Sequence, residues 1–370
     1  MGFLHTVVSI VLGALGLFFS PGSTTPAPAP MVLADKPAAV GLATSSATLP
    51  RPAAALVTTV RPSAATAPHR APEAPVATPA PVQAPTVSQA QVDAKARAAL
   101  VNILCTSGGS GYFNPLSGSG VIVDKRGVIL TNAHVAQYFL LRDYPYANNV
   151  RCVVRVGSPA QSKYTARLLY LPPAWIKANA SKIGGQNITG TGENDYAFLL
   201  ITDSLDGSPL PANFPTLTMA IDESDTGEPV LLAAYPAEFL GGSTVQTNLF
   251  ISSTVTAVEK LLTFNSTSTV DMVSVPGTIV SQEGSSGGAT VRLRDGALQG
   301  IITTESVAAT TGGRDLRAIL LAHIDRSLKA EGLGGIAALL EGDVEKEAII
   351  FNTNVAPEET QALEAVLNKQ

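Results

Sequence analysis

The glycine-rich stretch SQEGSSGGAT, residues 281–290, places a serine where a reactive hydroxyl could lie. A hydroxyl can attack a carbonyl from a tight bend whose backbone N–H groups hold the oxyanion that forms. The G-x-S-G-G frame selects Ser286 as the nucleophile, with the N–H groups of Gly284 and Ser286 as oxyanion donors. Glycine and serine also cluster in ordinary turns, so this interpretation depends on suitable partners elsewhere in the chain.

A serine nucleophile needs a general base, and the chain has four histidines. His5 lies in an apolar run and His69 in a proline-rich tract. His323 lies in a helix-like segment, where a structural or surface role is expected. His134, in the sequence TNAHVA, is the one histidine within the strand-rich region, so it is the expected base.

The third member of such a set is an acid that accepts a hydrogen bond from the far ring nitrogen of the histidine. Asp195, in ENDYAFLLI, is the best candidate because an apolar strand pattern follows it at once and would hold its carboxylate in place. Asp143, Asp203 and Asp271 lie in turn-like or exposed contexts and are weaker candidates.

Together, TNAHVA around His134, NDYAFLLI around Asp195 and GSSGG around Ser286 resemble the chymotrypsin-like serine peptidases. The order His, Asp, Ser is that family's order and differs from the orders in subtilisins and α/β-hydrolases. The intervals of 61 residues from His134 to Asp195 and 91 from Asp195 to Ser286 leave room for each half of a double barrel.

The motifs GSGV at 118–121 and GEPV at 227–230 are also similar to bacterial trypsin-fold proteases of the HtrA type. The resemblance covers about residues 98–308 and implies cleavage of peptide bonds through an acyl-enzyme. HtrA-type enzymes usually carry a C-terminal peptide-binding PDZ domain. The segment after the barrel is instead mostly helical in pattern, so no PDZ domain is expected.

The chain departs from the digestive members of this family at one position, and the resemblance also implies which residues form the specificity pocket. Digestive members have an aspartate before the nucleophile that pairs with a freshly cut N-terminus, whereas Ser285 stands there in this chain. An enzyme competent as folded is therefore expected. By its distance from the nucleophile, Val280 lies near the base of the specificity pocket, and the strand through Thr303, Thr304 and Glu305 forms its wall. Small or medium apolar side chains are expected before the scissile bond.

Short β-branched runs separated by glycine, proline, asparagine and aspartate surround these residues, which predicts an all-β barrel or sandwich. The resemblance makes this a double six-stranded antiparallel β-barrel of the trypsin type. The expected strands lie at 101–105, 120–123, 128–131, 152–156, 166–170, 196–201, 230–234, 254–258, 269–275, 288–293 and 298–303. Helices are expected at 88–100, at 315–330 and from Pro357 onward.

Four regions are expected along the 370 residues. Residues 3–20 contain no Asp, Glu, Lys or Arg and form either a marginal membrane anchor or a long signal-peptide core within a 1–20 segment. The missing Ala-x-Ala site favours an uncleaved anchor. Residues 21–90 hold 14 of the 26 prolines and predict a disordered spacer. The protease domain follows at 91–312 and a helical extension at 313–370.

The two cysteines, Cys105 and Cys152, lie in separate expected strands on either side of His134 and lack metal-ligand spacing. In an exported protein, a disulfide that braces this half-barrel is favoured over two free thiols.

A net charge of −5, with 14% charged residues and no dense basic cluster, argues against nucleic acid as a partner. No metal and no cofactor are expected. The leading hypothesis is a serine endopeptidase outside the cytoplasm, at the cell surface or in the periplasm, either membrane-anchored or secreted, that acts on proteins or peptides. One alternative is a catalytically inactive trypsin-fold binding module at the surface. Another is a structural surface protein that works through its Pro/Ala tract.

Overall fold

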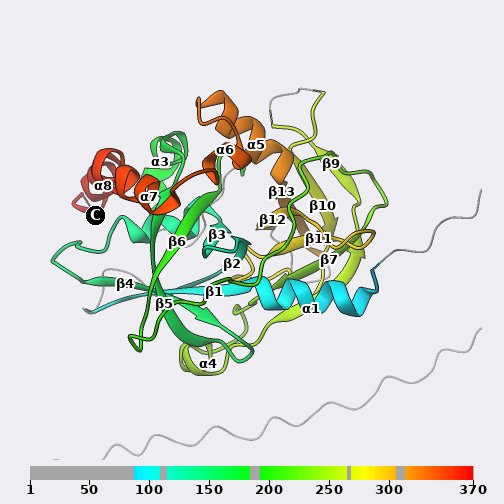
Figure 1. Cartoon of the computed structure of the whole chain (residues 1–370), viewed down its shortest axis with the longest axis horizontal. Coiled ribbons are helices and arrows are strands. Elements are labelled where there is room, and N and C mark those ends of the chain that lie inside the picture. Colours follow the sequence, from blue (N-terminus) through cyan, green and yellow to red (C-terminus); the bar gives the residue numbers. More distant parts are fainter. Residues whose placement is uncertain (1–86, 109–114, 184–191, 265–267, 306–312, 370) are drawn as a thin grey trace, which may run out of the picture. The chain divides into compact units, whose positions relative to one another are not determined.

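A computed structural model describes residues 87–108, 115–183, 192–264, 268–305 and 313–369 (Figure 1). These residues belong to one compact unit, Thr78–Gln370. The expected anchor segment and nearly all of the expected spacer, including His5 and His69, lie outside the described residues. Within the described ranges, no helix combines the length and apolarity needed to cross a bilayer.

Six strands close a first barrel in the order β1-β2-β3-β6-β5-β4, with antiparallel neighbours (Figure 1). They are β1 (Leu100–Ser107), β2 (Leu116–Asp124), β3 (Val128–Thr131), β4 (Val150–Val156), β5 (Gln161–Tyr170) and β6 (Ala197–Ser204). The turn from β2 to β3 uses Gly127 at φ +91°, a left-handed conformation that glycine adopts without a Cβ clash. The expected strands at 120–123 and 128–131 therefore form a β-hairpin.

A second sheet has the order β8-β7-β11-β12-β13-β10-β9. Its strands are β7 (Pro229–Ala234), β8 (Ser252–Ala257), β9 (Lys260–Leu262), β10 (Met272–Pro276), β11 (Ala289–Arg292), β12 (Leu298–Glu305) and β13 (Asp315–Leu320). The two outer strands are consecutive in the chain, and β8 pairs with β7 while β9 pairs with β10. Between them, the N–H groups of Val258 and Glu259 donate to the carbonyls of Glu228 and Ser274. These bonds bring the two edges of the sheet toward each other, so it curves into a second half-barrel, and the architecture fits the predicted trypsin-like double barrel.

The prediction of a helix over 315–330 is wrong for its first six residues, which form β13. This strand pairs with β12 on one side and β10 on the other, and helix α5 (Leu321–Ala330) begins only after it. Leu316, Ala318 and Leu320 alternate into the apolar core of the second barrel. Pairing with two distant strands therefore overrides the local helical pattern, and the segment after residue 312 begins with a barrel strand.

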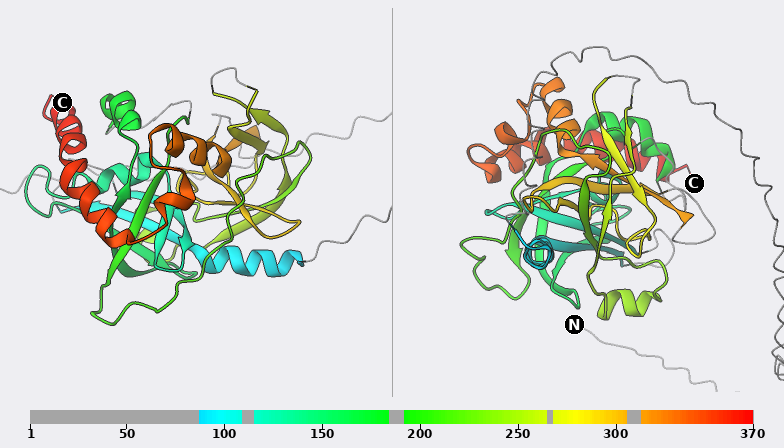
Figure 2. Two further views of the ribbon diagram at one scale, coloured as in Figure 1. Left: turned by 45° about the horizontal axis from the view of Figure 1, so that its top comes forward. Right: turned by 90° about the vertical axis from the view of Figure 1, so that its right-hand side faces the viewer.

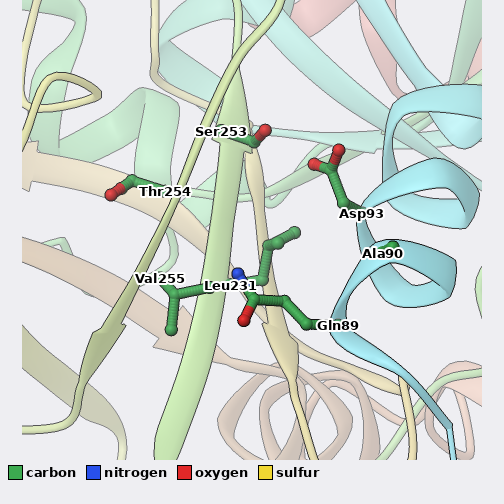
Figure 3. Close-up of a pocket in the computed structure, with 7 residues that line it drawn as sticks. All are labelled: Gln89, Ala90, Asp93, Leu231, Ser253, Thr254 and Val255. Carbon is green, nitrogen blue, oxygen red and sulfur yellow. The ribbon is translucent and has the colours of Figure 1, made fainter.

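Helix α1 (Gln89–Ala99) precedes β1 and confirms the first predicted helix. Its Arg97 donates to Ser253 Oγ at 3.2 Å and to the Ile251 carbonyl at 3.3 Å, so it braces the start of the first barrel against the second. A small pocket lies between α1 and strands β7 and β8 (Figure 3). Its lining consists of Gln89, Ala90, Asp93, Leu231, Ser253, Thr254 and Val255.

The remaining helices lie outside the two sheets. They are α2 (Ala133–Ala136), α3 (Pro173–Asn179), α4 (Gly242–Thr247), α6 (Ile336–Leu339), α7 (Val344–Asn354) and α8 (Ala356–Leu367), with the 3-10 helices η1 (Gln137–Phe139) and η2 (Ala180–Lys182). Helices α7 and α8 pack beside the first barrel (Figure 2). Asn352 Nδ2 donates to the Leu168 carbonyl at 2.6 Å, and Thr360 Oγ1 donates to the Leu140 carbonyl at 3.2 Å. Because Pro357 lies in the first turn of α8, the predicted last helix is confirmed.

Burial raises the pKa of Glu359, in the first turn of α8, to about 8, and the nearby Glu358 and Glu331 add to this rise. The side chain is buried, and among the described residues neither carboxylate oxygen has a hydrogen-bond partner. Folding therefore favours the protonated acid, so its contribution to stability is complete at acid pH and is lost as the pH rises through about 8.

Scanning calorimetry should therefore show the unfolding temperature of the wild type falling more between pH 6 and pH 9 than that of Glu359→Gln. The amide has no proton to lose in this range. Glu347→Gln, which replaces an exposed acid in the first turn of α7, is the control and should behave nearly as the wild type does. Equal falls for wild type and Glu359→Gln would contradict the prediction.

A disulfide joins Cys105 and Cys152, which face each other across β1 and β4. The pairing of β1 with β4 completes the first barrel, so the bridge reinforces the strand seam that closes it. Its two cysteines are 47 residues apart, and in the chain-entropy model a loop of this length stabilises the fold by roughly 4 kcal/mol. The expected disulfide is confirmed.

Candidate active site

His134 lies on the one-turn helix α2, directly after β3. Asn132, which precedes this helix in an extended conformation, donates through Nδ2 to the Asp195 carbonyl at 2.8 Å. This bond ties the end of β3 to the segment that precedes β6. The histidine side chain is 17% exposed, so its ring is shielded on most sides but still reaches the surface.

Asp195 contacts His134 through both carboxylate oxygens. Oδ2 lies 2.8 Å from His134 Nδ1, and Oδ1 accepts from the His134 backbone N–H at 2.9 Å. A third bond comes from Thr303 Oγ1, which donates to Oδ2 at 2.7 Å. Burial raises the pKa of the Asp195 carboxyl, but the neighbouring histidine and these hydrogen bonds outweigh it and hold the pKa below its ordinary value. A charged acceptor at Nδ1 requires a proton there, which leaves Nε2 available as a base.

The turn that carries Ser286 is bonded to the first barrel. Gly284 and Gly287 adopt left-handed conformations at φ +91° and +84°. The N–H of Ser119, on β2, donates to the Ser286 carbonyl at 2.7 Å, and the Ser119 hydroxyl donates to the Gly284 carbonyl at 2.8 Å. Thr131, at the end of β3, donates to the Ser119 carbonyl at 2.7 Å. These contacts bring the serine turn and the histidine strand to the same seam between the barrels.

The Ser286 side chain is partly exposed at this seam. Among the described residues, no hydrogen bond joins its hydroxyl to His134 Nε2. In resting enzymes this bond is often long and tightens only when substrate is bound.

Two backbone donors beside Ser286 are unpaired. The N–H groups of Gly284 and Ser286 make no hydrogen bond within the part of the chain that the structure describes. Their neighbours are bonded: the Ser285 N–H donates to Gln282, and the Gly287 N–H donates to Ile302. A turn that leaves these two N–H groups available can hold an oxyanion formed at the serine.

The four residues expected at the specificity pocket lie in different settings. Val280 is fully buried in the apolar core of the second barrel. Thr303 is also buried, and its hydroxyl binds Asp195, a role that the sequence reasoning missed. The signal in the sequence was a residue with a hydroxyl group on the strand that was expected to form the wall of the specificity pocket. Thr304 and Glu305 lie at the end of β12, with side chains outside the described part.

His323 forms a second histidine–aspartate pair on α5. Its Nδ1 lies 2.9 Å from Asp271 Oδ1, which also accepts from Arg326 Nη2 at 2.7 Å. Burial lowers the pKa of the His323 ring. The Nε2 atom has no hydrogen-bond partner among the described residues. Those residues also contain no group of three or more His, Cys, Asp or Glu that could hold a metal ion.

The first barrel and the second sheet, with a histidine, an aspartate and a serine turn between them, have the architecture of the trypsin fold. Residues 118–301 match the family model of the trypsin-like peptidase domain. His134, Asp195 and Ser286 all lie within the matched range.

Solved structures also match the chain. The Rv3671c protease from M. tuberculosis, in its active form, is 17% identical, and the match covers 64% of this chain and 82% of that one with a TM-score of 0.40. No curated protein matches the chain.

Proposed function

We propose that the protein is a serine endopeptidase in which Ser286 is the nucleophile, His134 the general base and Asp195 the acid that orients it. The observation that carries the proposal is the double contact of a charged Asp195 with His134, at the seam where the Ser286 turn leaves two N–H groups unpaired.

In the proposed reaction, His134 Nε2 removes the proton from Ser286 Oγ as this oxygen bonds to the substrate carbonyl carbon. The negative charge moves to the carbonyl oxygen, where the N–H groups of Gly284 and Ser286 stabilise it. Each such donor contributes about 10²–10³ in rate. The imidazolium, stabilised by Asp195, then gives its proton to the leaving amine as the peptide bond breaks. Water repeats the sequence and releases the acyl group.

The residue before the scissile bond is expected to be apolar. The Val280 side chain is buried and packs in an apolar core with Ile302, Leu316 and Ala318. A charged side chain placed against it would lose its hydration without gaining a partner.

Fluorogenic peptides that differ only at the residue before the cleavage site should therefore give higher kcat/KM with valine or leucine than with arginine or aspartate. One missing favourable contact in an apolar pocket changes this ratio by roughly 10- to 200-fold. A preference for arginine would overturn the assignment of Val280 to the base of the pocket.

Labelling by a fluorophosphonate probe tests the nucleophile. Wild type should label, and Ser286→Ala should not. Ser285→Ala is the matched control, because Ser285 is the adjacent serine but its hydroxyl is buried. Labelling that survives Ser286→Ala would overturn the nucleophile assignment. A folded wild type that does not label would favour the inactive surface binding module.

We also propose that the enzyme works outside the cytoplasm, tethered through the apolar run at 3–20 or released by cleavage behind it. The Cys105–Cys152 disulfide supports this location, because such bridges persist in oxidising compartments. Fractionation of cells that express the full chain should recover it in the membrane if the run is an uncleaved anchor, and as a shortened soluble form if it is a signal peptide. Recovery of the full-length chain in the cytoplasm would contradict the proposal.

A further inference from the structure

The residue directly before the nucleophile is a serine, which has no charge with which to form an ion pair. Ser285, the residue before the nucleophile, is 1% exposed, and within the described residues its hydroxyl has no hydrogen-bond partner. The conformation that presents the oxyanion donors must therefore be held by other contacts.

The peptide group between Glu283 and Gly284 is fixed from one side. The Ala237 N–H donates to the Glu283 carbonyl at 2.8 Å. In a planar trans peptide the C=O and N–H point in opposite directions, so this bond directs the Gly284 N–H away from Ala237. A Cβ on Gly284 would lie 2.8 Å from the Tyr235 carbonyl oxygen and 2.9 Å from Ala237 Cβ, so the segment 235–237 lies directly against this peptide.

Arg314 joins that segment to the turn. Its guanidinium donates through Nη1 and Nη2 to the two carboxylate oxygens of Glu238, at 2.6 Å for Nη2. Nη1 also donates to the Ser281 carbonyl at 2.7 Å. Both side chains are largely buried, at 12% exposed for Arg314 and 22% for Glu238. One cation therefore binds the residue after Ala237 and the start of the turn at the same time.

We propose that Arg314 and Glu238 are positioning residues that hold the Glu283–Gly284 peptide with its N–H directed to the oxyanion. The proposal rests on the serine peptidase function proposed above. A bidentate arginine–carboxylate pair fixes both distance and orientation. Without this pair, residues 235–238 can withdraw from the turn, the Glu283 carbonyl loses its donor, and the peptide can rotate. Rotation removes one of the two oxyanion donors and leaves the contacts between Asp195 and His134 unchanged.

Steady-state kinetics and inhibitor binding on Arg314→Met, Arg314→Lys and Glu238→Gln test this proposal. Loss of part of one donor's contribution should lower kcat by about 10- to 100-fold in Arg314→Met and Glu238→Gln, with a much smaller change in KM. The Lys variant should recover part of the loss. Affinity for a peptidyl aldehyde, which forms an oxyanion with Ser286, should fall in proportion to kcat. The pH profile of kcat/KM should keep its midpoint, because His134 and Asp195 are untouched.

The control is Arg142→Met, which breaks an ion pair with Asp143 that is exposed on the first barrel. It should match wild type in kcat and in aldehyde affinity. If both Arg314→Met and Glu238→Gln keep kcat and aldehyde affinity within twofold of wild type, the proposal is overturned. If Arg314→Met does not fold, Glu238→Gln decides the question, because it keeps the side-chain size and removes the charge. A wild type that forms no aldehyde adduct and does not label overturns the enzyme function itself, which separates the two failures.

Discussion

Replacing Asp195 by asparagine should lower kcat by about four orders of magnitude. In the wild type, Oδ1 accepts from the His134 backbone N–H, while Oδ2 accepts from the Thr303 hydroxyl and faces His134 Nδ1. Asparagine keeps the shape but replaces one acceptor oxygen by an NH₂ group. If the NH₂ group takes the place of Oδ1, it faces the His134 backbone N–H, which is also a donor. If it takes the place of Oδ2, it donates to His134 Nδ1 and so favours the imidazole tautomer with its proton on Nε2. That tautomer cannot accept the serine proton.

The measurement is kcat for a fluorogenic peptide, with thermal unfolding to establish that the variant is folded. Thr303→Val is the graded control, because it removes one of the three bonds and leaves the charge. This variant should lower kcat by about 10- to 100-fold, as expected for the loss of one hydrogen bond to a charged group. A loss below tenfold in folded Asp195→Asn would show that another acid orients His134.

Replacing Gly287 by alanine should greatly lower the free energy of unfolding. Gly287 has φ +84°, where a Cβ is strained, and that Cβ would lie 2.0 Å from the Ser119 carbonyl oxygen and 2.5 Å from Thr131 Oγ1. Neither neighbour can move freely, because Thr131 Oγ1 donates to the Ser119 carbonyl within the first barrel. The turn must therefore leave the seam, and we expect a loss of more than about 4 kcal/mol in the free energy of unfolding.

Gly227→Ala is the matched control for the Gly287→Ala substitution. Gly227 has the same φ, +84°, but a Cβ there would meet no atom within 4 Å. Its cost should be limited to the left-handed backbone, about 1–2 kcal/mol. Urea unfolding of the two variants measures the difference. Similar midpoints would mean that backbone strain alone, and not contact between the barrels, explains the requirement for Gly287.

Much of the fold and of the candidate site could be predicted because the signals are local. Short β-branched runs between turn residues indicate strands wherever they occur, and all eleven expected runs overlap a strand along more than half of their length, although the run at 269–275 begins three residues before β10 (Met272–Pro276). His134, Asp195 and Ser286 could be singled out from residue type, order and spacing, since each stands in a short motif with its own chemical reason. The disulfide followed from two cysteines on strands of one half-barrel.

Several features were decided only by the tertiary structure. Residues 315–320 have apolar residues at helical spacing, yet they form β13. This strand pairs with β12 on one side and with β10 on the other. The Thr303 hydroxyl, on β12 of the second sheet, donates to Asp195, which lies 108 residues earlier in the chain. Arg314 reaches Glu238 across 76 residues of sequence. The physical reason is common to all three: strand pairing and side-chain contacts between distant segments contribute more free energy than local propensity, and no short motif records which segments will meet.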